Sequence, residues 1–190
     1  MTGAGLTLHL WRRLDWRYLL PVHRVGDVIL AGPADDLLEA ALPLLGTSLR
    51  RIERREDWPS VREAADVVVL VQPDDDDLRG AVAALRPGGW VYVEVRRDLR
   101  LPRGRRSLVG RRRALRRAGL VDVATHWHAP DFATCSRIVD LDQHTVVRNA
   151  LGRHEAVRFG TALSLAGRTA LRLGLFPLAV REGSLLGRRP

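Results

Sequence analysis

The sequence contains no lysine, so all 31 of its basic residues are arginines, against 22 acidic residues and a formal net charge of +9. A complete absence of lysine points to coding bias in a GC-rich genome as much as to a binding surface. The charge alone therefore does not indicate a nucleic-acid partner. The single cysteine, Cys135, excludes a disulfide framework and any zinc site built on two or four cysteines.

Long hydrophobic runs are also missing, and none reaches the roughly 18 apolar residues needed to cross a bilayer. Residues 1–10 are too short and too mildly apolar for a secretory leader, and Arg12 and Arg13 follow them rather than precede them. We therefore expect a soluble protein without a transmembrane segment, in a reduced, cytoplasmic setting. Its length fits one domain, and 46% hydrophobic residues can supply a core.

Apolar runs alternate with helical patterns through the first two thirds of the chain. Buried strands are predicted at residues 27–32, 66–72 and 90–95, with a shorter strand at 49–54. Helices are predicted at residues 35–45, 76–85 and 107–118, with a short one at 59–65. This alternation predicts an α/β fold with a doubly wound, mostly parallel, Rossmann-like sheet.

The alternation of strands and helices ends after Gly119. Residues 120–128 and 136–141 read as two strands with no helix between them, which predicts a terminal antiparallel hairpin at the sheet edge. We expect residues 143–190 to form a helical C-terminal tail on the same domain, with a long helix at 155–173. Residues 1–24 form a separate amphipathic segment before the α/β domain of residues 25–142, and its Trp11, Trp16 and Tyr18 are expected to pack over the sheet as core or interface anchors.

One local pattern is specific enough to suggest a family. Residues 85–91, Leu-Arg-Pro-Gly-Gly-Trp-Val, resemble the L-(K/R)-P-G-G turn before the fifth strand of class I S-adenosylmethionine-dependent methyltransferases. Residues 113–120 are similar to the helix that leads into the sixth strand of that family. The resemblance covers residues 25–142 and implies transfer of a methyl group to a small molecule, an anionic one included, with S-adenosylmethionine as cofactor.

The first strand and its turn depart from the family pattern, which is an acidic residue followed by G-x-G-x-G. Here Gly32 stands alone and is followed by Pro33, which has no amide donor. The resemblance implies that the cofactor contacts come from Ala31, Gly32, Asp35, Glu53 and Gln72. The spacing from Leu49 to Asp66 is too short for a full third strand with its helices, so one αβ unit is expected to be shortened or lost.

Four aspartates, residues 74–77, follow the predicted strand at 66–72. They suit the capped, acidic beginning of a helix. They also suit a cluster in which Asp74 and Asp75 bind a cationic or hydroxyl-rich substrate, or a metal ion.

A histidine pair lies in the predicted hairpin. His126 and His128 are two apart on a strand and so share a face, where either is a candidate general base for deprotonating a hydroxyl before methyl transfer. Asp131, in the following turn, is a candidate substrate ligand. Packed or surface histidines are the alternative, and a zinc site completed by Cys135 or Asp131 is a further one, although we predict no metal.

Eleven arginines lie within residues 96–117, immediately after the predicted strand at 90–95. They form either a solvated basic face or an anion site that begins with Arg96 and Arg97, because arginine binds phosphate and carboxylate at two points. An anionic lipid surface suits such a site as well as a phosphorylated molecule does. The block contains no aromatic residue for base stacking, so we do not expect a nucleic-acid partner.

Three functions remain open from the sequence. The first is a small-molecule methyltransferase. The second is a degenerate methyltransferase-like domain that binds a protein partner or a neighbouring domain as a scaffold module, which the sparse glycine turn favours. The third, an RNA-binding or RNA-methylating domain, rests on the arginine block alone.

Overall fold

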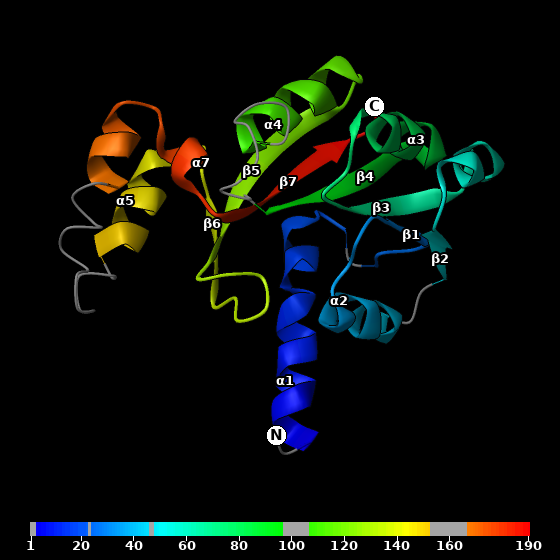
Figure 1. Cartoon of the computed structure of the whole chain (residues 1–190), viewed down its shortest axis with the longest axis horizontal. Helices are drawn as coiled ribbons and strands as arrows, with labels where there is room; N and C mark the ends of the chain where they lie inside the picture. The colour runs from blue at the N-terminus through cyan, green and yellow to red at the C-terminus, as the bar shows by residue number, and fades with distance from the viewer. Residues whose placement is uncertain (1–2, 23, 46–47, 97–106, 153–166) are drawn as a thin grey trace.

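The computed structural model describes residues 3–22, 24–45, 48–96, 107–152 and 167–190. Its strands are β1 (Val28–Ala31), β2 (Leu49–Ile52), β3 (Ala65–Val71), β4 (Leu85–Arg96), β5 (Val121–Ala129), β6 (Arg137–Asp140) and β7 (Glu182–Arg188). They form one sheet in the order β2-β1-β3-β4-β7-β5-β6 (Figure 1).

The direction of the strands confirms a mostly parallel sheet that ends in an antiparallel pair. β2, β1, β3 and β4 pair in parallel with one another. β5 and β6 pair antiparallel at the far edge, as the sequence predicts. β7 runs antiparallel to both β4 and β5 and joins the two halves of the sheet.

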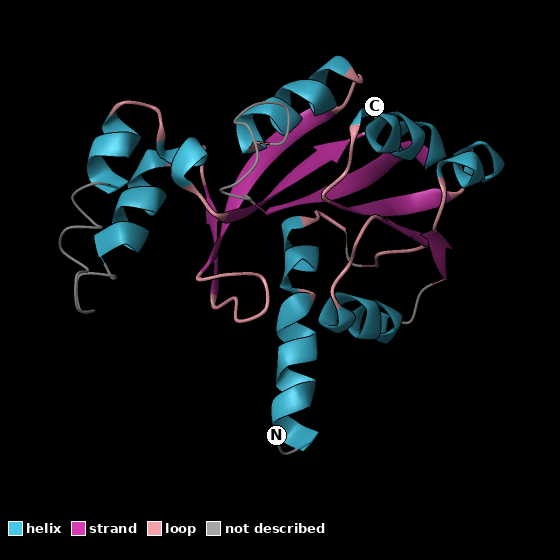
Figure 2. Ribbon diagram, in the orientation of Figure 1, coloured by secondary structure: helices cyan, strands magenta, loops and turns pink. Residues whose placement is uncertain are grey.

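Helices cover both faces of the sheet (Figure 2). The α-helices are α1 (Gly3–Arg13), α2 (Asp36–Ala41), α3 (Asp75–Ala84), α4 (Leu108–Arg117), α5 (His144–Gly152) and α7 (Phe176–Ala179), and the 3₁₀ segments are η1 (Asp15–Leu19), η2 (Leu42–Leu45) and η3 (Arg55–Val61). Residues from η1 and α2 share one buried cluster with one face of the sheet, and residues from α3 and α4 share a second cluster with the other face. In the described part of the chain, no helix is long and apolar enough to span a membrane.

Three helices begin where side chains cap them. Asp35 accepts a hydrogen bond from the Leu38 amide, and Ser107 accepts one from the Gly110 amide. Asp74 accepts hydrogen bonds from the Asp76 and Asp77 amides. These contacts satisfy backbone donors that the first turn of a helix leaves free.

The C-terminal tail differs from the expectation. The tail is helical at residues 144–152, 167–172 and 176–179, but Glu182–Arg188 is a strand in the middle of the sheet. Most of the long helix expected at 155–173 lies outside the described residues. Two glycines give this strand a weak sequence pattern, and Gly183 is needed because a Cβ there would lie 2.7 Å from the His126 carbonyl oxygen.

The shortened αβ unit is confirmed. β2 is an edge strand, and only η3 connects it to β3. The helix expected at residues 59–65 is wrong, because the 3₁₀ segment ends at Val61 and contains Pro59. Its Trp58 is buried against the same core as α3.

Candidate functional site

The carboxyl ends of the parallel strands bring together residues that are far apart in the sequence. Glu94, near the end of β4, lies opposite Val71, the last residue of β3. Gly32 follows β1 with a φ of +94°, and a Cβ there would lie 2.0 Å from the Val71 carbonyl oxygen. The single glycine of this turn is therefore required for close packing of two strands.

Arg13, the last residue of α1, fills the space above this edge. Its Nη1 lies 2.5 Å from Oε1 of Glu94, and its Nη2 lies 2.6 Å from Oε2 of the same carboxylate. The Arg13 side chain is 1% exposed and that of Glu94 is 0% exposed. Arg13 also donates to both carboxylate oxygens of Asp35, at 3.3 and 3.1 Å. One guanidinium thus joins the N-terminal segment to β4 and to the turn after β1.

Aromatic rings enclose this ion pair. The Trp16 ring stacks on that of Tyr92 with 4.6 Å between centroids, and the Tyr92 hydroxyl donates to Glu94 Oε1 at 3.3 Å. The Arg13 guanidinium lies 5.2 Å from the centroid of the Phe132 ring, and that of Arg96 lies 5.5 Å from it. Trp16 is thus buried over the sheet as expected, whereas Trp11 and Tyr18 lie on the outside.

The charges stabilise one another. Burial lowers the pKa of Arg13, but the adjacent Glu94 carboxylate outweighs it and raises the pKa above its ordinary value. Burial raises the pKa of Asp35, but the hydrogen bonds and charge of Arg13 outweigh it and lower the pKa below its usual range. Burial and the Glu94 charge raise the pKa of Tyr92, so its hydroxyl stays protonated.

The structure places most of the predicted cofactor residues at this edge of the sheet. Ala31 is buried, Asp35 is committed to Arg13, Arg96 and the α2 cap, and Glu53 is exposed beyond the edge strand. Gln72 donates to the Arg96 carbonyl oxygen at 2.7 Å. In the arrangement described, Gly32 packs against the end of β3 and Asp35 is paired with Arg13.

Sequence reasoning did not single out Arg13 or Glu94. One sequence feature could have indicated Glu94, because it interrupts the otherwise apolar end of a predicted buried strand. No such feature indicated Arg13, because an arginine that follows an amphipathic helix looks like any solvated one.

The predicted histidines share a face and are both buried. His128 Nε2 lies 2.8 Å from Ser184 Oγ, and its Nδ1 lies 3.6 Å from Cys135 Sγ. Burial lowers the pKa of His128 to about 3, and it also lowers the pKa of His126. The two rings are therefore uncharged at neutral pH. Among the described residues, no group of histidine, cysteine and carboxylate side chains is arranged to hold a metal ion.

Each predicted substrate residue that the structure describes is bound to another group of the protein itself. Asp74 caps α3 and pairs with Arg55, and Asp75 pairs with Arg111 on α4. Asp131 accepts hydrogen bonds from the amide and hydroxyl of Thr134. Arg97 lies outside the described residues, as do positions 98–106 of the arginine block.

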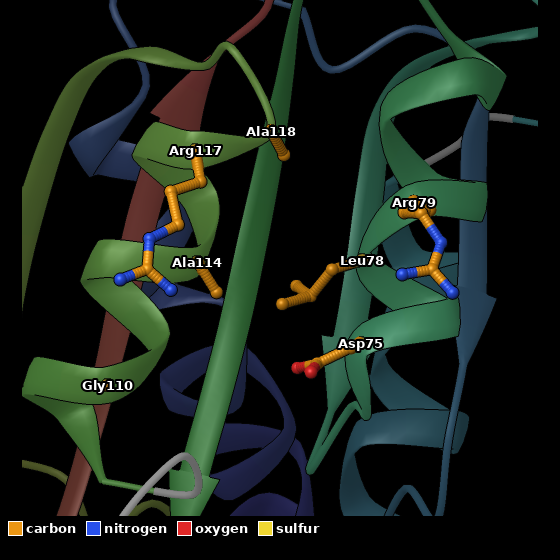
Figure 3. A pocket seen from close by; sticks show the side chains of 7 residues that line it. All are labelled: Asp75, Leu78, Arg79, Gly110, Ala114, Arg117 and Ala118. Atoms are coloured by element: carbon orange, nitrogen blue, oxygen red, sulfur yellow. The ribbon is translucent and has the colours of Figure 1, made fainter.

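A shallow hollow of about 340 Å³ lies between α3 and α4, on the other face of the sheet from Arg13. Figure 3 shows the Arg79 and Arg117 guanidinium groups on opposite sides of it, with Leu78 and Ala114 between them. A smaller one of about 90 Å³ lies beside Thr125 and Arg112. None of the predicted cofactor residues lines either hollow.

We compared the sequence and the structure with those of known proteins. No family model and no curated protein matches the chain in sequence. Solved structures do match in shape. A methyltransferase of Archaeoglobus fulgidus, described as S-adenosylmethionine-dependent, aligns with 95% of this chain and 94% of its own, at a TM-score of 0.54 and 11% identity. The chain has the fold of class I S-adenosylmethionine-dependent methyltransferases.

Two further structures share this methyltransferase fold. Phosphoethanolamine N-methyltransferase 2 of Haemonchus contortus aligns with all of this chain at a TM-score of 0.51 and 12% identity, but the alignment spans only 58% of that enzyme's chain. The third structure is a complex between the Haloferax volcanii Trm112 methyltransferase activator and a methyltransferase. One of its chains aligns with 98% of this chain and 93% of its own length, at a TM-score of 0.50 and 15% identity. At these identities the likeness extends to the fold alone.

Proposed function

We propose that this chain is a methyltransferase-fold domain that works as a binding or scaffold module, with its cofactor edge closed by its own N-terminal segment. The observation that carries the proposal is the buried two-point ion pair between Arg13 and Glu94 above the ends of β1 and β4. In this fold, ligands bind outside the carboxyl ends of the parallel strands. Here that position is taken by a side chain of the protein itself.

Moving Arg13 away from the carboxyl ends of the strands would cost free energy. If Arg13 left, the Glu94 carboxylate would remain buried without a partner, which costs about 3–5 kcal/mol. A ligand that had to displace Arg13 would therefore bind about 10²–10⁴-fold more weakly than at an open edge. The Trp16–Tyr92 stack adds to the barrier, because it attaches the same segment to β4.

The histidines support the same reading. A general base must reach the proton that it removes. His128 is 3% exposed and contacts Ser184 and Cys135, and His126 is 6% exposed. Neither presents a ring nitrogen to a substrate at the surface, which favours a module over a catalyst.

The second candidate is methyl transfer from S-adenosylmethionine to a small molecule, an anionic one included. The likeness to the Archaeoglobus fulgidus methyltransferase favours it, and S-adenosylmethionine would be its cofactor. This function requires a form of the protein in which the N-terminal segment has left the edge. A protein partner could bring about that change, and the Haloferax volcanii structure is a complex with an activator protein.

Isothermal titration calorimetry with S-adenosylmethionine and its demethylated product tests the proposal on the full chain. We expect no heat and no thermal shift at about 1 mM ligand. A Kd below about 100 μM would overturn the closed-edge proposal and favour the second candidate. Glu94→Gln serves as the matched variant. Binding gained only in that variant would show that the ion pair is what excludes the cofactor.

A further inference from the structure

The N-terminal segment has a second face, which points away from the sheet. Leu8, Trp11 and Tyr18 are 51%, 41% and 72% exposed. Together with Arg17 they form what we call the N-terminal patch.

The four side chains are contiguous. The Arg17 guanidinium lies 5.3 Å from the centroid of the Trp11 ring and 4.3 Å from that of Tyr18. Leu8 lies three residues before Trp11 on α1 and so shares its face. The patch is thus an arginine held between two exposed aromatic rings, with an aliphatic side chain one turn away.

The surroundings of the patch are basic. Residues 1–26 contain four arginines and one acidic residue, Asp15. Arg13 is paired inside the protein with Glu94 and Asp35. In the part of the chain that the structure describes, no carboxylate lies within salt-bridge distance of Arg12 or Arg17. Asp15 interacts electrostatically with both of these arginines, so the positive charge on this segment is only partly compensated.

We propose that the N-terminal patch docks the protein onto an anionic lipid surface. Tryptophan and tyrosine favour the boundary between headgroups and acyl chains, and arginines beside them are attracted to anionic headgroups. α1 projects from the body of the protein, so its outer face can reach a flat surface (Figure 1). This role goes beyond the module proposed above and does not depend on whether the cofactor edge opens.

Two observations favour lipid over protein occupants. On α1 itself only Leu8 and Trp11 are exposed apolar anchors among the side chains described, fewer than the i, i+3, i+4, i+7 series that a helix presents to a protein groove. Self-association through the patch would bring two copies of the Arg17 guanidinium close together, and their like charges disfavour it.

Co-sedimentation of the full chain with vesicles tests the proposal. We expect binding to vesicles of equal phosphatidylglycerol and phosphatidylcholine, little binding to phosphatidylcholine alone, and a steep loss between 0.05 and 0.5 M salt. The double variant Trp11→Ala, Tyr18→Ala should bind about tenfold more weakly. Arg17→Gln should lose about fivefold on anionic vesicles.

Matched controls exclude a general loss of surface hydrophobicity or charge. Leu44→Ala and Val121→Ala remove other exposed apolar side chains, 41% and 38% exposed, and should bind as the wild type does. Arg79→Gln removes an exposed arginine of α3 and should also have no effect. The variants at Trp11, Tyr18, Leu44, Val121 and Arg79 should keep the wild-type thermal midpoint, because those side chains are exposed. Arg17 is half-buried, so the midpoint of Arg17→Gln is measured beside its vesicle binding.

Tryptophan fluorescence gives an independent readout. Trp16, Trp58 and Trp90 are at most 8% exposed and Trp127 is partly buried, so Trp11 is the tryptophan that bilayer contact should change. Brominated phosphatidylcholine in anionic vesicles should quench the wild type and spare Trp11→Phe. Absence of vesicle binding, equal binding to neutral vesicles, or unchanged binding of the double variant would each overturn the proposal. A dimer that forms through the patch without vesicle binding would do so as well.

Discussion

Arg13 and Glu94 are 81 positions apart in the chain, yet they form two hydrogen bonds, with N···O distances of 2.5 and 2.6 Å. Both side chains are almost fully buried. The contact holds the N-terminal segment against the central strand β4. A buried ion pair of this kind gives little net stability, but breaking one half of it is expensive.

Replacing Glu94 with glutamine should therefore destabilise the protein strongly. The Arg13 charge would remain buried without its main counter-charge, and we expect a loss of about 3–5 kcal/mol in the free energy of unfolding. Urea denaturation measures it. Asp122→Asn is the matched control, because it breaks the exposed Arg188–Asp122 pair and should cost less than about 1 kcal/mol. Equal losses in the two variants would contradict the assigned role of Arg13.

Gly32→Ala should be much more harmful than Gly88→Ala. Both glycines have positive φ, +94° and +81°, so both variants carry about 1–2 kcal/mol of backbone strain. At Gly32 the new Cβ would also lie 2.0 Å from the Val71 carbonyl oxygen, whereas at Gly88 nothing lies within 4 Å. Thermal unfolding of the two variants gives the comparison. If Gly88→Ala is the worse of the two, the close packing of β1 on β3 has been misjudged.

The buried His128 should make the protein sensitive to acid. Burial lowers its pKa from 6.5 to about 3 in the folded protein, so between these pH values the unfolded chain binds a proton that the folded one does not. The contribution of neutral His128 to the free energy of unfolding is fully present above pH 6.5 and is lost as the pH falls toward 3. Between these pH values the free energy of unfolding changes by up to about 1.4 kcal/mol per pH unit because of this one proton.

His128→Gln should lower the dependence of unfolding free energy on pH between 6 and 4, whatever its effect at pH 7. Urea denaturation at several pH values, on the variant and the wild type, measures that slope. Parallel curves would show that His128 takes up its proton in the folded protein at an ordinary pH.

Cys135 should be unreactive in the native protein. The side chain is buried, and burial raises the pKa of its thiol, so little thiolate is present at neutral pH. We expect a thiol-exchange reagent to modify native protein at least about 100-fold more slowly than protein unfolded in urea. Rapid, complete modification under native conditions would mean that the turn between β5 and β6 opens readily.

Much of the architecture was predictable because it depends on local chemistry. Valine-rich apolar runs predict β3 and the main part of β4. Capping aspartates and Ser107 mark where α2, α3 and α4 begin. The short connection before β3 predicts the lost αβ unit. β7 was missed because a strand with two glycines depends on neighbours, not on its own propensity. Trp11 and Tyr18 were expected to be core or interface anchors over the sheet, and they are exposed, because composition alone does not say which face of an amphipathic segment is covered.

The sequence by itself determined the lack of lysine and disulfides, the alternation of strands and helices, and a turn after β1 with one glycine. Only the tertiary structure decided what that turn does. Arg13, Asp35 and Glu94 come from three separate segments, and no local pattern relates them. The charges of Arg13 and Glu94 can be buried only together, since each would be too costly to desolvate alone, and the partly exposed Asp35 adds to the pair. That requirement is a property of the folded edge, so the arginine that closes it looked in the sequence like any other of the 31.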